Sequence, residues 1–104
     1  MVAEIRSREE FDYHIAVDNM LVVVSALAEG DGPCKDIAPL VSSLRAEHED
    51  VYFVKFDVGK APELALALGM MSEPTFFFFK WGKFIDLVVG ADPSALEEAI
   101  KKYK

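Results

Sequence analysis

The sequence predicts an α/β fold in which helices cover both faces of a mixed β-sheet. Apolar runs typical of strands alternate with segments whose apolar residues recur every three or four positions, as on one face of a helix. The early strand segments are separated by helical ones, which indicates parallel strands with crossover connections. The last two strand segments are joined by a tight turn, which indicates an antiparallel hairpin. The sheet is therefore expected to contain both kinds of pairing.

The N-terminal part begins with a short strand at residues 2–5. Ser7 is followed three residues later by Glu10, and this capping box marks the start of a helix that ends near residues 18–19. Residues 20–27 are almost entirely apolar and rich in valine, which is typical of a strand buried on both faces. This strand is therefore predicted to lie in the middle of the sheet.

The middle of the chain is predicted to hold two helices around one strand. A long helix at residues 33–48 follows the stretch GDGPCK, and Pro39 should kink it because proline removes a backbone donor. Residues 51–58 are strand-like. A short helix at residues 61–68 ends at Gly69, a suitable left-handed C-cap.

The C-terminal part is predicted to form a β-hairpin followed by a helix. A strand at residues 76–80 turns at Trp81–Gly82 into a second strand at residues 83–89. Successive side chains of a strand point to opposite faces of the sheet, and helices are expected to cover both faces. The four phenylalanines of this strand are therefore expected in the core. Asp92 and Pro93 provide an N-cap and a first helical residue for the last helix.

Composition excludes several classes of function. The net charge is −7, from 11 Lys and Arg against 18 Asp and Glu, so a clustered basic surface for nucleic acid or an anionic membrane is not expected. Cys34 is the only cysteine, so no disulfide forms within the chain. The charged N-terminus does not resemble a signal peptide, and the longest apolar stretch, residues 20–28, is too short for a membrane helix.

These totals lead to a simple set of expectations. Residues 1–104 are expected to form one domain and a monomer, cytoplasmic if natural, because cysteine usage favours a reducing compartment. No cofactor, metal or partner is identifiable. His14 and His48 lie on predicted helices near charged residues and are expected to be solvated.

Five motifs, in order along the whole chain, then resemble the thioredoxin family. They are GPCK opening a helix, IAP containing Pro39, FVKFDV at 53–58, PTFFFFKWGK at 74–83 and VVGADPSAL at 88–96. The resemblance implies a thioredoxin fold with four helices. It also implies a sheet in which the strands lie in the order 2–5, 51–58, 20–27, 76–80 and 83–89.

The resemblance also locates a redox motif that departs from the family pattern WCGPCK. The remnant comprises Gly30, Asp31, Gly32, Pro33, Cys34 and Lys35. Asp31 stands at the family's attacking cysteine, Gly30 at its tryptophan, and Cys34 at its resolving cysteine. Ser25 stands at the family's buried aspartate, whereas Lys55 matches the lysine beside it.

A carboxylate cannot reduce a disulfide, so these replacements are expected to remove dithiol exchange. Asp31 is instead expected to cap the helix by accepting the backbone N–H of Cys34, a contribution of about 1 kcal/mol. Its negative charge should raise the pKa of the Cys34 thiol. A serine at position 25 avoids the cost of an unpaired buried carboxylate.

A second part of the expected site is the loop at Glu73, Pro74, Thr75 and Gly90. Pro74 matches the family's cis-proline, whose loop pairs with a bound peptide, and weak peptide binding there is left open. Glu73, with Asp31 and Glu29, would make the groove acidic. Without a histidine or cysteine partner, these carboxylates are not a convincing metal site.

The preferred interpretation is a redox-inactive thioredoxin that is computationally redesigned or degenerate, and not an enzyme. It rests on the retention of residues that backbone geometry demands and the loss of those that only catalysis demands. Two alternatives remain: a natural thioredoxin-like binding or scaffold module, and a weak monothiol redox protein acting through Cys34. In the redesigned case the chain would be a laboratory protein with no natural location.

Overall fold

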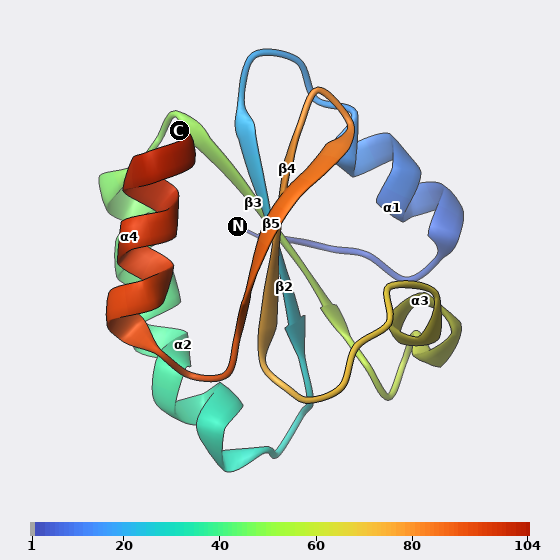
Figure 1. Cartoon of the computed structure of the whole chain (residues 1–104). Helices are drawn as coiled ribbons and strands as arrows, with labels where there is room; N and C mark the ends of the chain where they lie inside the picture. The colour runs from blue at the N-terminus through green and yellow to red at the C-terminus, as the bar shows by residue number, and fades with distance from the viewer. Residues whose placement is uncertain (1) are drawn as a thin grey trace.

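The computed structural model describes residues 2–104 and contains a five-stranded mixed sheet between two pairs of helices (Figure 1). The strands are β1 (Ala3–Glu4), β2 (Leu21–Leu27), β3 (Val51–Asp57), β4 (Thr75–Lys80) and β5 (Lys83–Val89). Their order across the sheet is β1-β3-β2-β4-β5, as the resemblance implies. β3 pairs parallel with β1 and β2, whereas β4 pairs antiparallel with β2 and β5.

The helices cover the two faces in pairs. They are α1 (Arg8–Ile15), α2 (Gly32–Glu47), α3 (Pro62–Ala67) and α4 (Pro93–Tyr103). In Figure 1, α2 and α4 lie on one side of the sheet and α1 and α3 on the other. The predicted order of elements is confirmed, although β1 is shorter than the expected strand and α2 begins at Gly32.

The helix starts follow from local sequence. At α1, Ser7 Oγ accepts the N–H of Glu10 at 3.1 Å, as the predicted capping box requires, but Glu10 Oε1 accepts the N–H of Arg6, one residue before the cap, at 2.6 Å, so only the Ser7 half of the box is formed. At α4, Asp92 Oδ1 accepts the N–H of Ala95 at 3.1 Å. Ser7 and Asp92 each satisfy a backbone donor that the helix itself leaves free.

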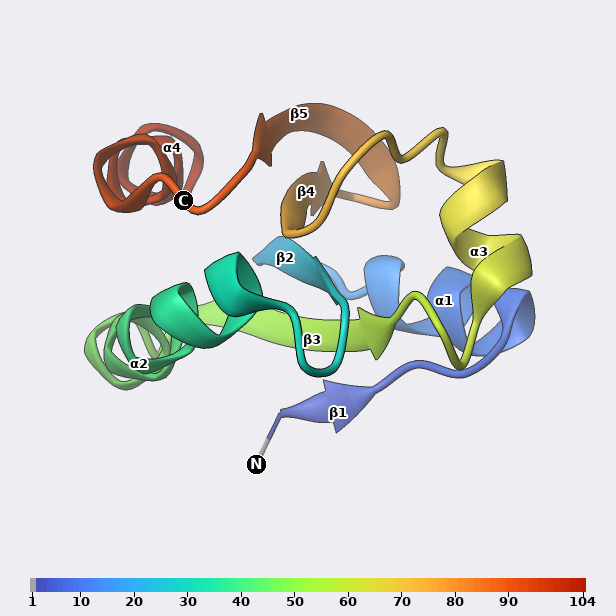
Figure 2. The same ribbon diagram turned by 90° about the horizontal axis from the view of Figure 1, so that it is seen from below.

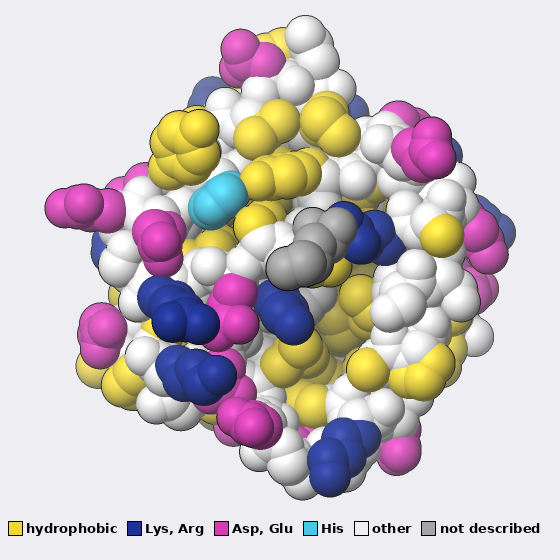
Figure 3. Space-filling model, turned by 180° about the vertical axis from the view of Figure 1, so that it is seen from behind, with side chains coloured by type: hydrophobic (Ala, Val, Ile, Leu, Met, Phe, Trp, Pro, Cys, Tyr) yellow, Lys and Arg dark blue, Asp and Glu magenta, His cyan; other side chains and the backbone are white. Residues whose placement is uncertain are grey.

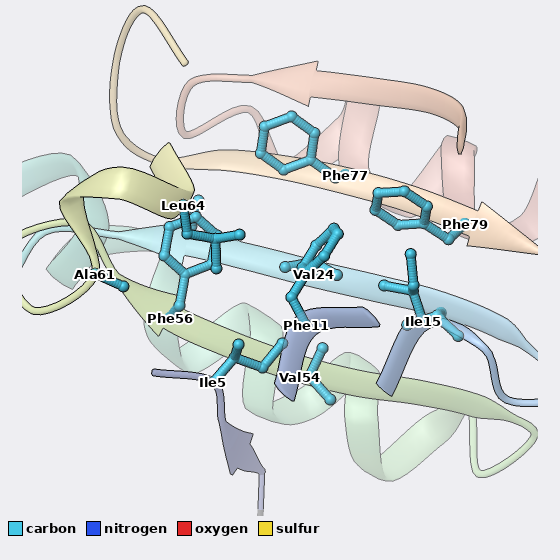
Figure 4. Packing of buried hydrophobic residues seen from close by; sticks show 12 residues of the cluster. Ile5, Phe11, Ile15, Val24, Val54, Phe56, Ala61, Leu64, Phe77 and Phe79 are labelled. Atoms are coloured by element: carbon cyan, nitrogen blue, oxygen red, sulfur yellow. The ribbon is translucent and has the colours of Figure 1, made fainter. Parts of the chain in front are cut away.

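The core consists of two apolar layers, one on each face of the sheet. Phe76 and Phe78 point to the layer under α2 and α4, whereas Phe77 and Phe79 point to the layer under α1 and α3. Figure 4 shows the second layer, in which Phe11 of α1 meets Phe79 edge to face with ring centroids 5.4 Å apart. The phenylalanine run is therefore core, as predicted.

The histidines differ from the expectation of solvated side chains. His48 caps the C-terminus of α2 and is buried, with Nδ1 2.9 Å from Lys104 Nζ. His14 Nδ1 lies 2.6 Å from the Tyr52 hydroxyl and is half-buried. Both predictions failed because they considered only neighbours in the chain, whereas these partners come from α4's end and from β3.

Candidate functional site

The turn between β2 and α2 carries the motif remnant. Gly30 has φ +84°, a left-handed conformation that glycine adopts without strain. Asp31 follows in an extended conformation as the N-cap of α2, and its Oδ2 accepts the N–H of Cys34 at 3.1 Å. Gly32, Pro33 and Lys35 lie in the first turn, with Lys35 exposed. The structure thus places Asp31 where the sequence predicted a cap.

Cys34 is almost covered, with 6% of its surface exposed, and its Sγ accepts the N–H of Ala28 at an N···S distance of 3.3 Å. Burial raises the pKa of this thiol above its ordinary value of 9.0, and the nearby carboxylates of Asp31 and Glu73 raise it further. The Ala28 N–H opposes this shift because it stabilises the thiolate. The thiol is therefore mostly protonated at neutral pH.

Ser25 and Lys55 lie side by side in the sheet, as a directly paired position of β2 and β3. Ser25 is buried, and both residues line a cavity of about 120 Å³ beneath α2. Lys55 also lines a larger pocket of about 370 Å³, which Cys34 and Gly30 reach from the other side. The structure thus brings Ser25, Lys55 and the Cys34 thiol to adjoining cavities.

Glu4 is a residue near the site that the sequence reasoning missed. β1 places it directly opposite Lys55 in β3, and it lines the same pocket as Cys34. Its Oε2 is buried, has no hydrogen-bond partner among residues 2–104, and lies 3.6 Å from Arg6 Nε. The only signal for this placement was the register of the first strand, which local patterns do not determine.

The cis-proline loop lies at the same end of the sheet as the start of α2 (Figure 2). The Glu73–Pro74 bond is cis, and Pro74 is buried. The carbonyl of Pro74 accepts the N–H of Gly90 at 2.7 Å, and the Thr75 hydroxyl donates to the carbonyl of Ser72 at 2.7 Å. Gly90 has φ +91°, which explains the glycine there. The four predicted loop residues therefore lie together.

Charge is dispersed over the face seen in Figure 3, where acidic and basic side chains are interspersed with apolar ones. Over residues 2–104, no group of three or more His, Cys, Asp or Glu side chains is arranged to hold a metal ion. None of the helices described is both long and apolar enough to span a bilayer.

Comparison with known proteins identifies the class. The model of the thioredoxin family matches residues 2–102. Thioredoxin-2 of Saccharomyces cerevisiae is 39% identical over 100 residues, 96% of each chain, and thioredoxin-1 of Schizosaccharomyces pombe is 39% identical over 97% of each. The structure of Fasciola hepatica thioredoxin superposes with a TM-score of 0.95 at 34% identity, covering 99% of this chain and 100% of that one. This chain belongs to the thioredoxin family.

These relatives overturn the preferred interpretation of a redesigned or degenerate protein. Identity of 39% to proteins named thioredoxin, spread over nearly the whole chain, supports a natural thioredoxin. The prediction of redesign was wrong because it treated agreement between local sequence and backbone as a mark of design. Natural sequences show the same agreement, since folding selects for it.

The prediction that the protein is not an enzyme is contradicted as well. Its relatives carry the name of a family of disulfide oxidoreductases. Asp31 in place of a cysteine excludes only a disulfide between two thiols of this chain. One remaining cysteine does not settle redox activity, because a mixed disulfide can also be resolved by a thiol from another molecule.

Proposed function

We propose that this chain is a natural thioredoxin-family protein that exchanges disulfides through the single thiol of Cys34. The observation that supports this most is the position of that thiol. Cys34 lies in the first turn of α2, next to an open pocket of about 370 Å³ and within electrostatic reach of Glu73 in the cis-proline loop. In such a site a bound disulfide would meet a thiol rather than an inert side chain.

The reaction has two steps. The Cys34 thiolate attacks one sulfur of a substrate disulfide, so that a mixed disulfide forms and the other substrate sulfur leaves as a thiolate. A thiolate from a second molecule then attacks the mixed disulfide and releases Cys34. The external thiol keeps the other substrate sulfur in a new disulfide, so each cycle consumes one external thiol, releases one substrate thiol and leaves the protein unchanged. No second cysteine of this chain is needed.

The site makes this reaction slow at neutral pH. Only the thiolate attacks, and burial together with Asp31 and Glu73 holds the Cys34 pKa above 9.0. The rate should therefore rise as the pH increases towards that pKa. The Ala28 N–H bonded to Sγ is the contact that favours the thiolate.

Mass spectrometry of the intact protein tests the proposal. Incubation with a peptide disulfide should add one peptide to the wild type, faster at alkaline pH, and a small external thiol should remove it. The Cys34→Ser variant is the matched control and should gain nothing. A wild type that stays unmodified up to its alkaline limit of stability would disprove monothiol exchange.

A second candidate is a natural module that binds peptides at the Glu73–Pro74 loop without exchanging disulfides. It is favoured by the 6% exposure of Cys34, which restricts approach to the sulfur. Backbone groups of a cis-proline loop can pair with an extended peptide whatever the state of the thiol. Under this candidate, Cys34→Ser would bind peptides as well as the wild type does. A cytoplasmic location remains a prediction from cysteine usage, and cell fractionation would test it.

A further inference from the structure

β5 is an edge strand with an unusually apolar exposed surface. It is the last strand of the sheet, and no helix within residues 2–104 lies beyond its outer side (Figure 2). Four of its seven residues are large apolar side chains that stay exposed: Phe84 at 53%, Ile85 at 37%, Leu87 at 40% and Val89 at 54%. A long apolar edge strand is a template on which another strand can pair.

The direction of the free backbone groups follows from the pairing with β4. Residues 86–89 are in regular register with residues 75–78, and the next N–H, that of Gly90, donates to the Pro74 carbonyl. Successive N–H groups of a strand point to opposite sides. The N–H groups of Val88 and Gly90 therefore face β4, whereas those of Leu87 and Val89 face outward.

The central outward donor is already occupied. Asp86 Oδ1 accepts the N–H of Leu87 at 2.7 Å, and Asp86 Oδ2 accepts the hydroxyl of Tyr103 in α4 at 2.6 Å. Tyr103 of α4 thus holds one carboxylate oxygen, and the other oxygen covers the outward N–H of Leu87 on the edge of β5. The strand also bulges opposite Phe78 and Phe79. Charged side chains and bulges are both devices by which natural edge strands avoid pairing.

We propose that the Asp86 carboxylate, held by Tyr103, blocks antiparallel pairing of β5 with β5 of a second copy of this chain. The blocked surface is the outer edge centred on Leu87, and removing the carboxylate makes it a dimer interface. The inference is independent of the chemistry of Cys34.

Two features point to a second copy as the occupant. An antiparallel pair centred on Leu87 is two-fold symmetric, so the same apolar side chains meet on both sides. In this register Ile85 of each copy lies opposite Val89 of the other, so exposed apolar side chains of the two edges meet on both sides of the axis.

Sedimentation velocity across a concentration series tests the proposal. The wild type should stay at its monomer mass of 11.6 kDa, whereas Asp86→Ala should shift to twice that mass as concentration rises. Asp18→Ala makes the same change in net charge at an exposed position outside β5, and it should stay monomeric. Adding Leu87→Lys to Asp86→Ala should abolish the dimer, because the two lysines would face each other across the two-fold axis.

A folded Asp86→Ala protein that stays monomeric at every concentration would overturn the proposal. A dimer that survives Leu87→Lys would also overturn it, since the contact would then lie elsewhere. If Asp86→Ala does not fold, Tyr103→Phe carries the same test. It removes the hydroxyl that holds the carboxylate and should give a weaker but concentration-dependent dimer.

Discussion

At the scale of single residues, the site is governed by Asp31 and its bond to Cys34. This carboxylate both caps α2 and lies beside the Cys34 thiol, so it affects the stability of the helix and the reactivity of the thiol. The cap stabilises the helix, whereas the charge disfavours the thiolate. A substitution at Asp31 should therefore move stability and reactivity in opposite directions.

Asp31→Ala should lower stability by about 1 kcal/mol, since the Cys34 N–H loses its acceptor. The same change should lower the pKa of Cys34 and speed its alkylation near neutral pH. Chemical denaturation and the pH dependence of alkylation by iodoacetamide measure the two effects. Asp36→Ala, an exposed acid inside the same helix, is the control for charge. Equal alkylation rates in all three proteins would refute this account of Asp31.

The raised pKa of Cys34 also predicts a dependence of stability on pH. The folded state binds the thiol proton more tightly than the unfolded state does, so protonation of Cys34 stabilises the fold. This contribution to the free energy of unfolding is fully present below pH 9.0. It is lost as pH rises from 9.0 through the folded pKa. The free energy of unfolding of the wild type should therefore fall more steeply above pH 9.0 than that of Cys34→Ser. Parallel curves for the two proteins would contradict this prediction.

At the scale of elements, β4 and β5 form one hairpin with opposite environments. β4 lies inside the sheet between β2 and β5, and its four phenylalanines are at most 5% exposed, whereas β5 at the edge is mostly open. Their sequences, TFFFFK and KFIDLVV, are similarly apolar. The position in the sheet therefore decides which phenylalanine contributes to stability.

Phe78→Ala should lower the free energy of unfolding by about 3–5 kcal/mol, because the side chain is fully buried in the layer under α2 and α4. Phe84→Ala is the matched control in the paired strand, where 53% of the residue is exposed. Its cost should be clearly smaller. Denaturant unfolding of both variants gives the comparison, and equal losses would show that the burial pattern is misassigned.

At the scale of the whole molecule, both apolar layers share the same inner strands. β2 and β4 contribute side chains to both faces, so we expect the two layers to unfold together. The radius of gyration of 12.3 Å is close to the value of about 13 Å expected for a domain of this length. These features support our proposal that the chain forms one domain.

A single domain should unfold in one cooperative step. Transitions followed by tryptophan fluorescence at Trp81 and by far-ultraviolet circular dichroism should coincide in denaturant. Trp81 is in the hairpin turn, whereas dichroism reports all four helices. Two separated transitions would contradict the proposal.

Much of the fold could be predicted from the sequence because the signals were local. Ser7 with Glu10, and Asp31 with Cys34, are three residues apart, so their hydrogen bonds depend on the helix alone. The cis-proline loop was placed by resemblance to the thioredoxin family. The prediction of inactivity failed for a different reason, since the absence of one cysteine was taken to decide the activity of the whole protein.

The sequence by itself thus determined the order of elements, the helix caps, the family and the presence of one thiol. Only the tertiary structure decided the burial of His48, the place of Glu4 opposite Lys55, and the bond from Asp86 to Tyr103. Each of these features depends on contacts between residues that lie far apart in the sequence. Such contacts depend on strand register and on helix packing, which follow from burying the whole core at once and not from any short stretch of residues.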